Sequence, residues 1–111
     1  MDRAALKQTA DGGYIEKYRF DINSNAFIIN IDVLDADILS TYEVRFENLS
    51  RFLFESESRG IKDRLELTEM WIDETPEASS SEEWAVTISM WDMTHISLRC
   101  ASIVVDDAPL R

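Results

Sequence analysis

Few side chains in this sequence could carry out nucleophilic chemistry, and their spacing separates them. The chain holds one Cys, Cys100, and one His, His95. A nucleophile needs a base within hydrogen-bond reach. On one strand, a separation of five places the two residues on opposite faces and about 16 Å apart. We therefore expect no Cys–His pair: Cys100 is predicted to be a small buried residue, and His95 a surface or strand-end residue.

Other catalytic arrangements lack their sequence signatures. No Gly-x-Ser-x-Gly motif accompanies any serine, so a serine triad built on His95 is not expected. Two of the three glycines are Gly12 and Gly13, which leaves no Gly-rich phosphate loop. With 22 Asp and Glu, a pair of carboxylates in a cleft could still hydrolyse a glycoside. The prediction is a non-enzyme without catalytic residues, and a small carboxylate-dependent hydrolase is kept as an alternative.

The sequence has one pattern that imitates a metal site. Asp21, Asn23 and Asn25 have the spacing that opens a calcium loop, but Ala26 stands where that loop needs Gly. A hairpin turn explains the same residues, because Asp and Asn side chains bond their own backbone. One Cys and one His cannot build a structural zinc site. No metal and no cofactor are predicted.

The acidic side chains are concentrated in the second half of the chain. The net charge is −11; residues 65–111 hold ten acidic and two basic side chains, against 12 and nine in residues 1–64. Seven acidic residues fall between positions 66 and 83 without one Lys or Arg. Such a surface either steers a basic partner or keeps the domain soluble. It would repel nucleic acid and anionic membranes, so neither is an expected partner.

Two of the three tryptophans have an ambiguous position. Trp84 shares a row with Val86 and Ile88, which predicts a place in the core. Trp91 has the opposite parity, and Trp71 stands at a predicted strand end beside the acidic residues. Each either anchors an interface, where Trp is over-represented, or packs against a neighbouring segment.

Period-two alternation of apolar residues dominates the chain and predicts strands. The strands are expected near residues 14–20, 26–34, 42–47, 51–55, 65–72, 84–91 and 95–105. Short connections favour antiparallel pairing. We predict one domain over residues 1–111, an all-β antiparallel sandwich or small open barrel of about seven strands with little helix. Residues 1–12 are expected to be mobile or a short helix, residues 73–83 a mobile acidic loop, and Ala101–Ser102 a β-bulge.

No targeting signal is visible in the sequence. The opening residues lack the apolar run of a secretory signal, and no window approaches the roughly 20 apolar residues of a membrane span. A single thiol fits a reducing compartment, so a cytoplasmic location is expected.

Three segments carry a resemblance at the level of hydrophobic pattern: residues 42–49, 65–71 and 96–105. Their order resembles small uncharacterised bacterial β-rich proteins, some of them encoded beside toxin genes and suspected to be immunity proteins. The resemblance implies a protein-binding role and transfers no functional residue. Together with the charge pattern, it predicts a non-enzymatic domain that occludes a basic surface of a protein partner, an immunity-type inhibitor. A homo-oligomeric structural module is the alternative. The predicted partner-binding residues are Glu66, Glu69, Trp71, Asp73, Glu74, Glu82, Glu83 and Trp91.

Overall fold

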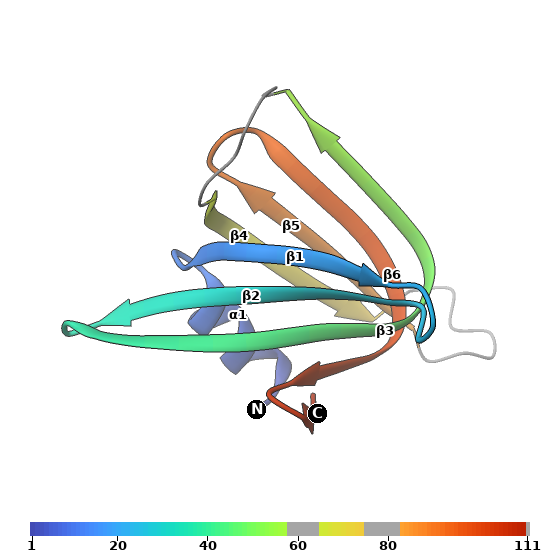
Figure 1. Ribbon diagram of the computed structural model, residues 1–111, viewed down its shortest axis with the longest axis horizontal. Coiled ribbons are helices and arrows are strands. Elements are labelled where there is room, and N and C mark those ends of the chain that lie inside the picture. Colours follow the sequence, from blue (N-terminus) through green and yellow to red (C-terminus); the bar gives the residue numbers. More distant parts are fainter. Residues whose placement is uncertain (58–64, 75–82, 111) are drawn as a thin grey trace.

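The computed structural model describes residues 1–57, 65–74 and 83–110, and its sheet curves round on itself (Figure 1). Within these residues, one short helix accompanies seven antiparallel strands in one sheet. The sheet rings without forming a regular barrel. The all-β antiparallel prediction is confirmed.

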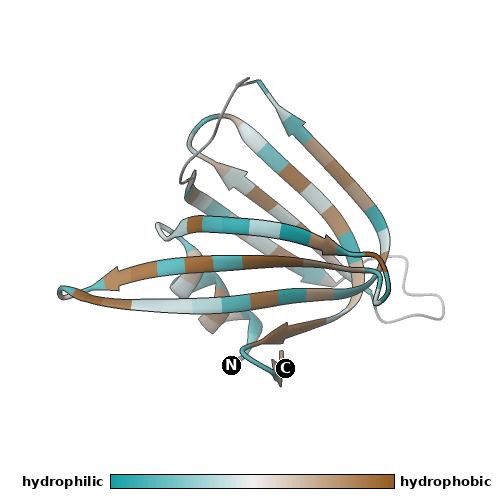
Figure 2. Cartoon of the chain, viewed as in Figure 1, coloured by the Kyte–Doolittle hydropathy of each residue, from teal (hydrophilic) through white to brown (hydrophobic). Residues whose placement is uncertain are grey.

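The helix, α1, spans Arg3–Ala10 and begins after Asp2, whose side chain accepts a hydrogen bond from the Ala5 N–H. The strands are β1 (Tyr14–Asp21), β2 (Ala26–Asp35), β3 (Ile38–Ser56), β4 (Leu65–Glu74), β5 (Trp84–Met90), β6 (Thr94–Val105) and β7 (Ala108–Pro109). Hydrophobic and hydrophilic residues alternate along many of them (Figure 2), because alternate side chains face the interior.

The ring is closed strongly on one side and weakly on the other. The strand order is β3-β2-β1-β4-β5-β6-β7, and a further pairing of β3 with β6 closes the ring. β1 and β4 pair only through Tyr14 with Glu66 and Ile15 with Leu65. Both strands begin at this contact, so only their first residues lie opposite each other in the described part of the chain.

β3 is one long strand where the sequence suggested two. Residues 38–46 of this strand pair with β2, and residues 44–56 pair with β6 on both sides of a bend. Asn48 adopts a left-handed backbone at the bend, with φ 55°. The Asn25 side-chain amide donates a hydrogen bond to the Leu49 carbonyl at 2.8 Å and holds the bend against the β1–β2 turn. The structure still has seven strands, because the short strand β7 adds one where β3 combines two expected strands.

The β-bulge predicted at Ala101–Ser102 of β6 was placed on the wrong strand. The register of the β3–β6 pairing shifts between Leu49 and Arg51, so the extra residue belongs to β3. Residues Asp73 and Glu74, assigned by prediction to a mobile loop, are the last residues of β4. The rest of that prediction, residues 75–82, lies outside the described residues.

The helix covers the edge of β4 that β1 leaves. The Asp11 carboxylate accepts a hydrogen bond from the Met70 N–H at 3.0 Å, and Lys7 Nζ donates one to the Met70 carbonyl at 3.1 Å. Leu6 and Ala10 of the same helix are buried in the core. Side chains of α1 thus satisfy backbone groups that would otherwise lack a strand partner.

The interior of the ring is a continuous apolar core. It is built from inner-facing residues of β1–β6 and from α1, with Phe27, Phe46, Ile29, Ile88 and Ile96 among its fully buried members. Among the described helical residues, no helix has the length and apolar character to cross a membrane.

Candidate partner-binding face

Three rows of side chains run across the outer surface of β4, β5, β6 and the second half of β3. The strand register sets the members of each row side by side. The rows are Asp73, Ala85, Arg99 and Arg51; Trp71, Thr87, Ser97 and Leu53; and Glu69, Ser89, His95 and Glu55. Alternate residues, such as Ile72, Val86 and Leu98, point inward and are buried. We call this surface the four-strand face.

Three of the six predicted acidic residues line one edge of this face. Glu69 and Asp73 project outward from β4, and exposed Glu66 precedes them on the same strand. The Trp91 N–H donates a hydrogen bond to the Glu66 carbonyl at 3.0 Å, so the β5–β6 turn is tied to the beginning of β4. The structure therefore brings Trp91 beside the acidic strand.

Two further predicted acidic residues lie where β4 ends and β5 begins. Glu74 is its last residue, and Glu83 directly precedes β5. Glu82 lies outside the described residues.

The exposure of the tryptophans resolves their ambiguity. Trp71, at the β4 end of the middle row of the four-strand face, is 47% exposed, and Trp91 in the β5–β6 turn is 75% exposed. Trp84 is half-buried and packs against the core, and the Arg3 guanidinium carbon lies 5.9 Å from the centroid of its ring. Trp71 and Trp91 thus present large apolar groups to solvent, whereas Trp84 serves the core.

Sequence reasoning missed a basic residue beside the acidic strand. Lys7 Nζ lies 4.0 Å from the ring centroid of Trp71 and 3.0 Å from the Asp11 carboxylate. A cation over an aromatic ring is attracted by the ring's electrons. β4 contains no Lys or Arg, but Lys7 of α1 places a basic side chain beside this strand. The same side chain covers one face of Trp71.

The row that begins with Asp73 contains two arginines that sequence reasoning also missed. Arg51 and Arg99 are directly opposite each other on β3 and β6. Neither forms an ion pair with any carboxylate in the part of the chain that is described. Parity alone indicated that both side chains point outward, but which strands would be neighbours was not visible in the sequence.

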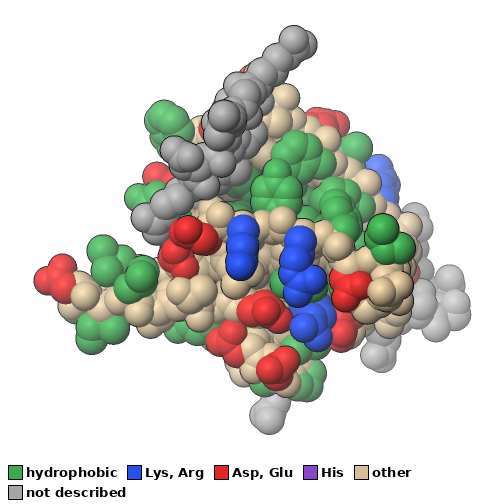
Figure 3. All heavy atoms as spheres, in the orientation of Figure 1, with side chains coloured by type: hydrophobic (Ala, Val, Ile, Leu, Met, Phe, Trp, Pro, Cys, Tyr) green, Lys and Arg blue, Asp and Glu red, His purple; other side chains and the backbone are tan. Residues whose placement is uncertain are grey.

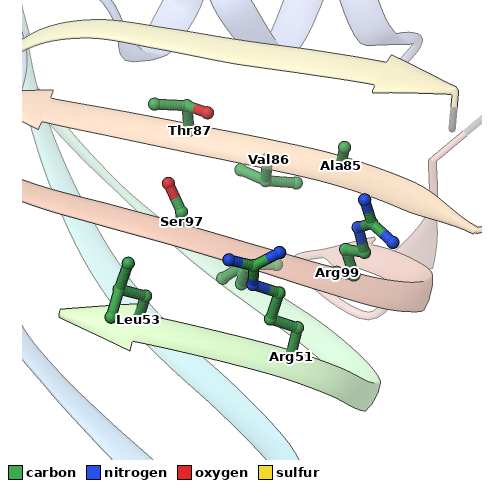
Figure 4. Close-up of a pocket in the computed structure, with 8 residues that line it drawn as sticks. Arg51, Leu53, Ala85, Val86, Thr87, Ser97 and Arg99 are labelled. Atoms are coloured by element: carbon green, nitrogen blue, oxygen red, sulfur yellow. The ribbon is translucent and has the colours of Figure 1, made fainter.

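The arginines border a shallow pocket of about 230 Å³ (Figure 4). The hydroxyl-bearing residues Thr87 and Ser97 line it, with Leu53 at one side. Ala85 lies between Arg99 and Asp73 in the row, and its short side chain does not fill the space between these two longer side chains.

On the face formed by β1–β3, basic side chains lie close to acidic ones. Figure 3 shows Lys and Arg side chains lying among Asp and Glu side chains over β1–β3. Arg45 is an example: its guanidinium lies 3.2 Å from the Glu43 carboxylate and 4.0 Å from that of Glu47. Arg45 therefore has carboxylate partners, whereas Arg51 and Arg99 form no ion pair with the described carboxylates.

Cys100 and His95 lie on opposite faces of β6, as predicted. Cys100 is fully buried, whereas His95 is exposed and its Nδ1 lies 3.2 Å from the Ser89 hydroxyl. Burial, and to a smaller extent the charge of Glu83, raises the pKa of the Cys100 thiol to about 12. The thiol is therefore protonated at neutral pH and is a packing group of the core.

The calcium-like residues form a hairpin turn, as predicted. The Asp21 carboxylate accepts hydrogen bonds from the backbone N–H groups of Asn23 at 3.1 Å and Ser24 at 3.4 Å. Hydrogen bonds from Ser24, its side chain first, lower the pKa of Asp21. Among the described residues, no three His, Cys, Asp or Glu side chains gather closely enough to hold a metal ion.

One open pocket contains two carboxylates, Asp11 and Asp35, beside the helix and the β2–β3 hairpin. Asp11 is already engaged by the Met70 N–H and by Lys7.

An aromatic cluster joins β1 to the second half of β3. Tyr18 and Phe20 of β1 contact Phe52 and Phe54 of β3 and the buried Phe27, with ring centroids 4.5 to 6.0 Å apart. Phe20 is 51% exposed despite these contacts. The cluster is a second apolar surface, and the spacing of its residues in the sequence gave no sign of its exposure.

No protein-family model matches the chain, and no curated protein matches it either. What the fold and the face define is an antiparallel β-domain with two exposed tryptophans on an acidic edge.

Proposed function

We propose that this chain is a non-enzymatic protein-binding domain that occludes a basic surface of its partner, in the manner of an immunity-type inhibitor. The binding surface is the β4 edge of the four-strand face together with the β5–β6 turn. The observation that carries the proposal is the gathering of Trp71 and Trp91 with Glu66, Glu69 and Asp73 along this one edge.

The tryptophans supply the anchors. Trp91 is largely exposed, so its burial in an interface would remove apolar area from water, which is favourable. Buried Trp residues often dominate binding energy. Lys7 covers one side of Trp71, so less side-chain freedom is lost when a partner covers the other side.

The carboxylates supply steering. Glu66, Glu69 and Asp73 extend along one strand, and the whole chain carries a net charge of −11. A basic surface approaching this edge is attracted over a distance set by the salt concentration, which raises the association rate more than the affinity.

The test uses the product of the gene next to this one as the candidate partner and measures association rates by biolayer interferometry. We expect the triple variant Glu66→Gln, Glu69→Gln, Asp73→Asn to associate about 10-fold more slowly at low salt, with the difference lost at high salt. Trp71→Ala is expected to speed dissociation about 10-fold or more.

The matched control removes three charges elsewhere, through Asp35→Asn, Asp37→Asn and Asp107→Asn at exposed turns outside the four-strand face. This variant is expected to associate at nearly the rate of the unmodified protein. Equal slowing by both triple variants would attribute the effect to net charge and refute a defined acidic surface.

A homo-oligomeric module is the second candidate, and the aromatic cluster favours it. Tyr18, Phe20 and Phe54 are each about 40 to 50% exposed, and from Lys17 onward β1 pairs with β2 alone among the described residues. Two copies could bury these rings against each other. Light scattering tests this: a dimer that Phe20→Ser converts to a monomer supports the module, and a monomer at every concentration refutes it.

A further inference from the structure

We propose that Arg51 and Arg99 form a binding site for the phosphate group of a small molecule. The site is the pocket between them and the hydroxyls of Thr87 and Ser97. It does not rest on the protein-binding role proposed above, because different residues carry it.

The first argument is the unneutralised charge. Arg51 and Arg99 are direct cross-strand neighbours, and like charges in that arrangement destabilise a sheet. The chain holds 22 acidic residues, yet none in its described part forms an ion pair with either arginine. A bound anion would remove the repulsion between them, so the pair favours the liganded state.

The second argument is that the hydrogen-bond donors and positive charges of the pocket match the oxygens and negative charge of a phosphate. Each guanidinium presents several N–H donors in a planar fork, which suits phosphate oxygens. Thr87 and Ser97 are opposite each other on β5 and β6 and add two hydroxyls at the same pocket. A carboxylate has two oxygens and one charge, whereas a phosphate monoester has three terminal oxygens and a charge of about −1.5 to −2 near neutral pH. The phosphate is the better complement to two cations and two hydroxyls.

The third argument concerns ligand size. The pocket has a volume of about 230 Å³, and Leu53 forms an apolar side to it. Asp73 lies in the same row beyond Ala85, and the chain as a whole is strongly acidic. Extended polyanions such as nucleic acids would be repelled, so a single phosphate on a small molecule is the class that fits.

The experiment measures binding by isothermal titration calorimetry at constant ionic strength, with phenyl phosphate, inorganic phosphate and benzoate as probes. Binding of either phosphate probe, at least about 10-fold tighter than benzoate, is the expected result. Tighter phenyl phosphate would identify an ester that contacts Leu53, and equal affinities would identify free phosphate as the ligand; both support the site. Absence of phosphate binding, or equal affinity for benzoate, would overturn it.

Variants then locate the binding. Arg51→Gln and Arg99→Gln are each expected to weaken phosphate binding by about 10- to 100-fold. The matched control is Arg19→Gln, an exposed arginine on β1 outside the four-strand face, and it should leave the affinity unchanged. Circular dichroism checks that each variant is folded. Folded Arg51→Gln and Arg99→Gln proteins that bind phosphate as well as the unmodified protein would refute the assignment.

Discussion

Lys7 of α1 and Trp71 of β4 are 64 positions apart in the chain, and the Lys7 ammonium lies 4.0 Å from the Trp71 ring centroid. The same ammonium contacts the Asp11 carboxylate and the Met70 carbonyl. The contact joins the helix to the open edge of β4 and covers one face of a tryptophan on the β4 edge of the four-strand face. Fold and candidate site thus depend on one side chain.

Replacing Lys7 by Met is expected to lower the free energy of unfolding by about 1–2 kcal/mol, because a cation–π contact and a hydrogen bond to a backbone carbonyl are both lost. Urea unfolding followed by Trp fluorescence measures the change. The control is Lys17→Met on β1, where the side chain is exposed. Equal losses in the two variants would contradict a specific role for Lys7.

Asn48 permits the bend of β3 because its backbone is left-handed, at φ 55°. Asn48→Val should destabilise the protein by about 1–3 kcal/mol, since a β-branched residue is strained there. Asn48→Gly should be tolerated. Ala101→Val, at an exposed strand position without a positive φ, is the comparison, and its free energy of unfolding should change little. If Asn48→Val proves as harmless as Ala101→Val, the bend does not depend on this residue.

The Cys100 thiol predicts a pH dependence of stability. Its pKa in the folded protein is raised from 9.0 to about 12, so above about pH 9 the unfolded chain loses a proton that the folded protein keeps. Stability from this group is therefore full below pH 9 and falls as the pH rises toward 12. The measurement compares urea unfolding of the unmodified protein and Cys100→Ala at about pH 8 and about pH 10. The unmodified protein should lose more stability over that interval, and parallel losses would argue against a buried thiol.

The arginine pair predicts an unusual sign for a charge removal. In phosphate-free buffer of moderate salt, Arg51→Gln should raise the free energy of unfolding by about 0.2–1 kcal/mol, because it relieves the repulsion with Arg99. Arg45→Gln is the matched variant and should lower it, because Arg45 is paired with Glu43 at 3.2 Å. Chemical denaturation of both variants gives the two signs. A loss of stability in both variants would mean that repulsion between Arg51 and Arg99 does not destabilise the folded protein.

Much of the fold was predictable from local pattern. The rows containing Phe27, Val86 and Leu98 placed those residues inward, and all three are buried. The turn at Asp21 followed from the ability of Asp and Asn to bond their own backbone. The bend was harder to predict, because nothing in the sequence near Asn48 distinguishes the end of one strand from a bend within a longer strand.

The candidate site was half predictable. Glu66, Glu69 and Asp73 were chosen because they are close in sequence, and one strand, β4, keeps them close in space. Lys7, Arg51 and Arg99 were missed because each meets its neighbours across distant segments of the chain.

The sequence by itself determined where most of the strand residues lie and which side chains of a strand face the same way, because a period of two follows from the geometry of an extended chain. It separated Cys100 from His95 for that reason. Only the tertiary structure decided which strands are neighbours and in what register. Those choices depend on long-range contacts: the pairing of β3 with β6 brings Arg51 opposite Arg99, and the packing of α1 on β4 brings Lys7 against Trp71.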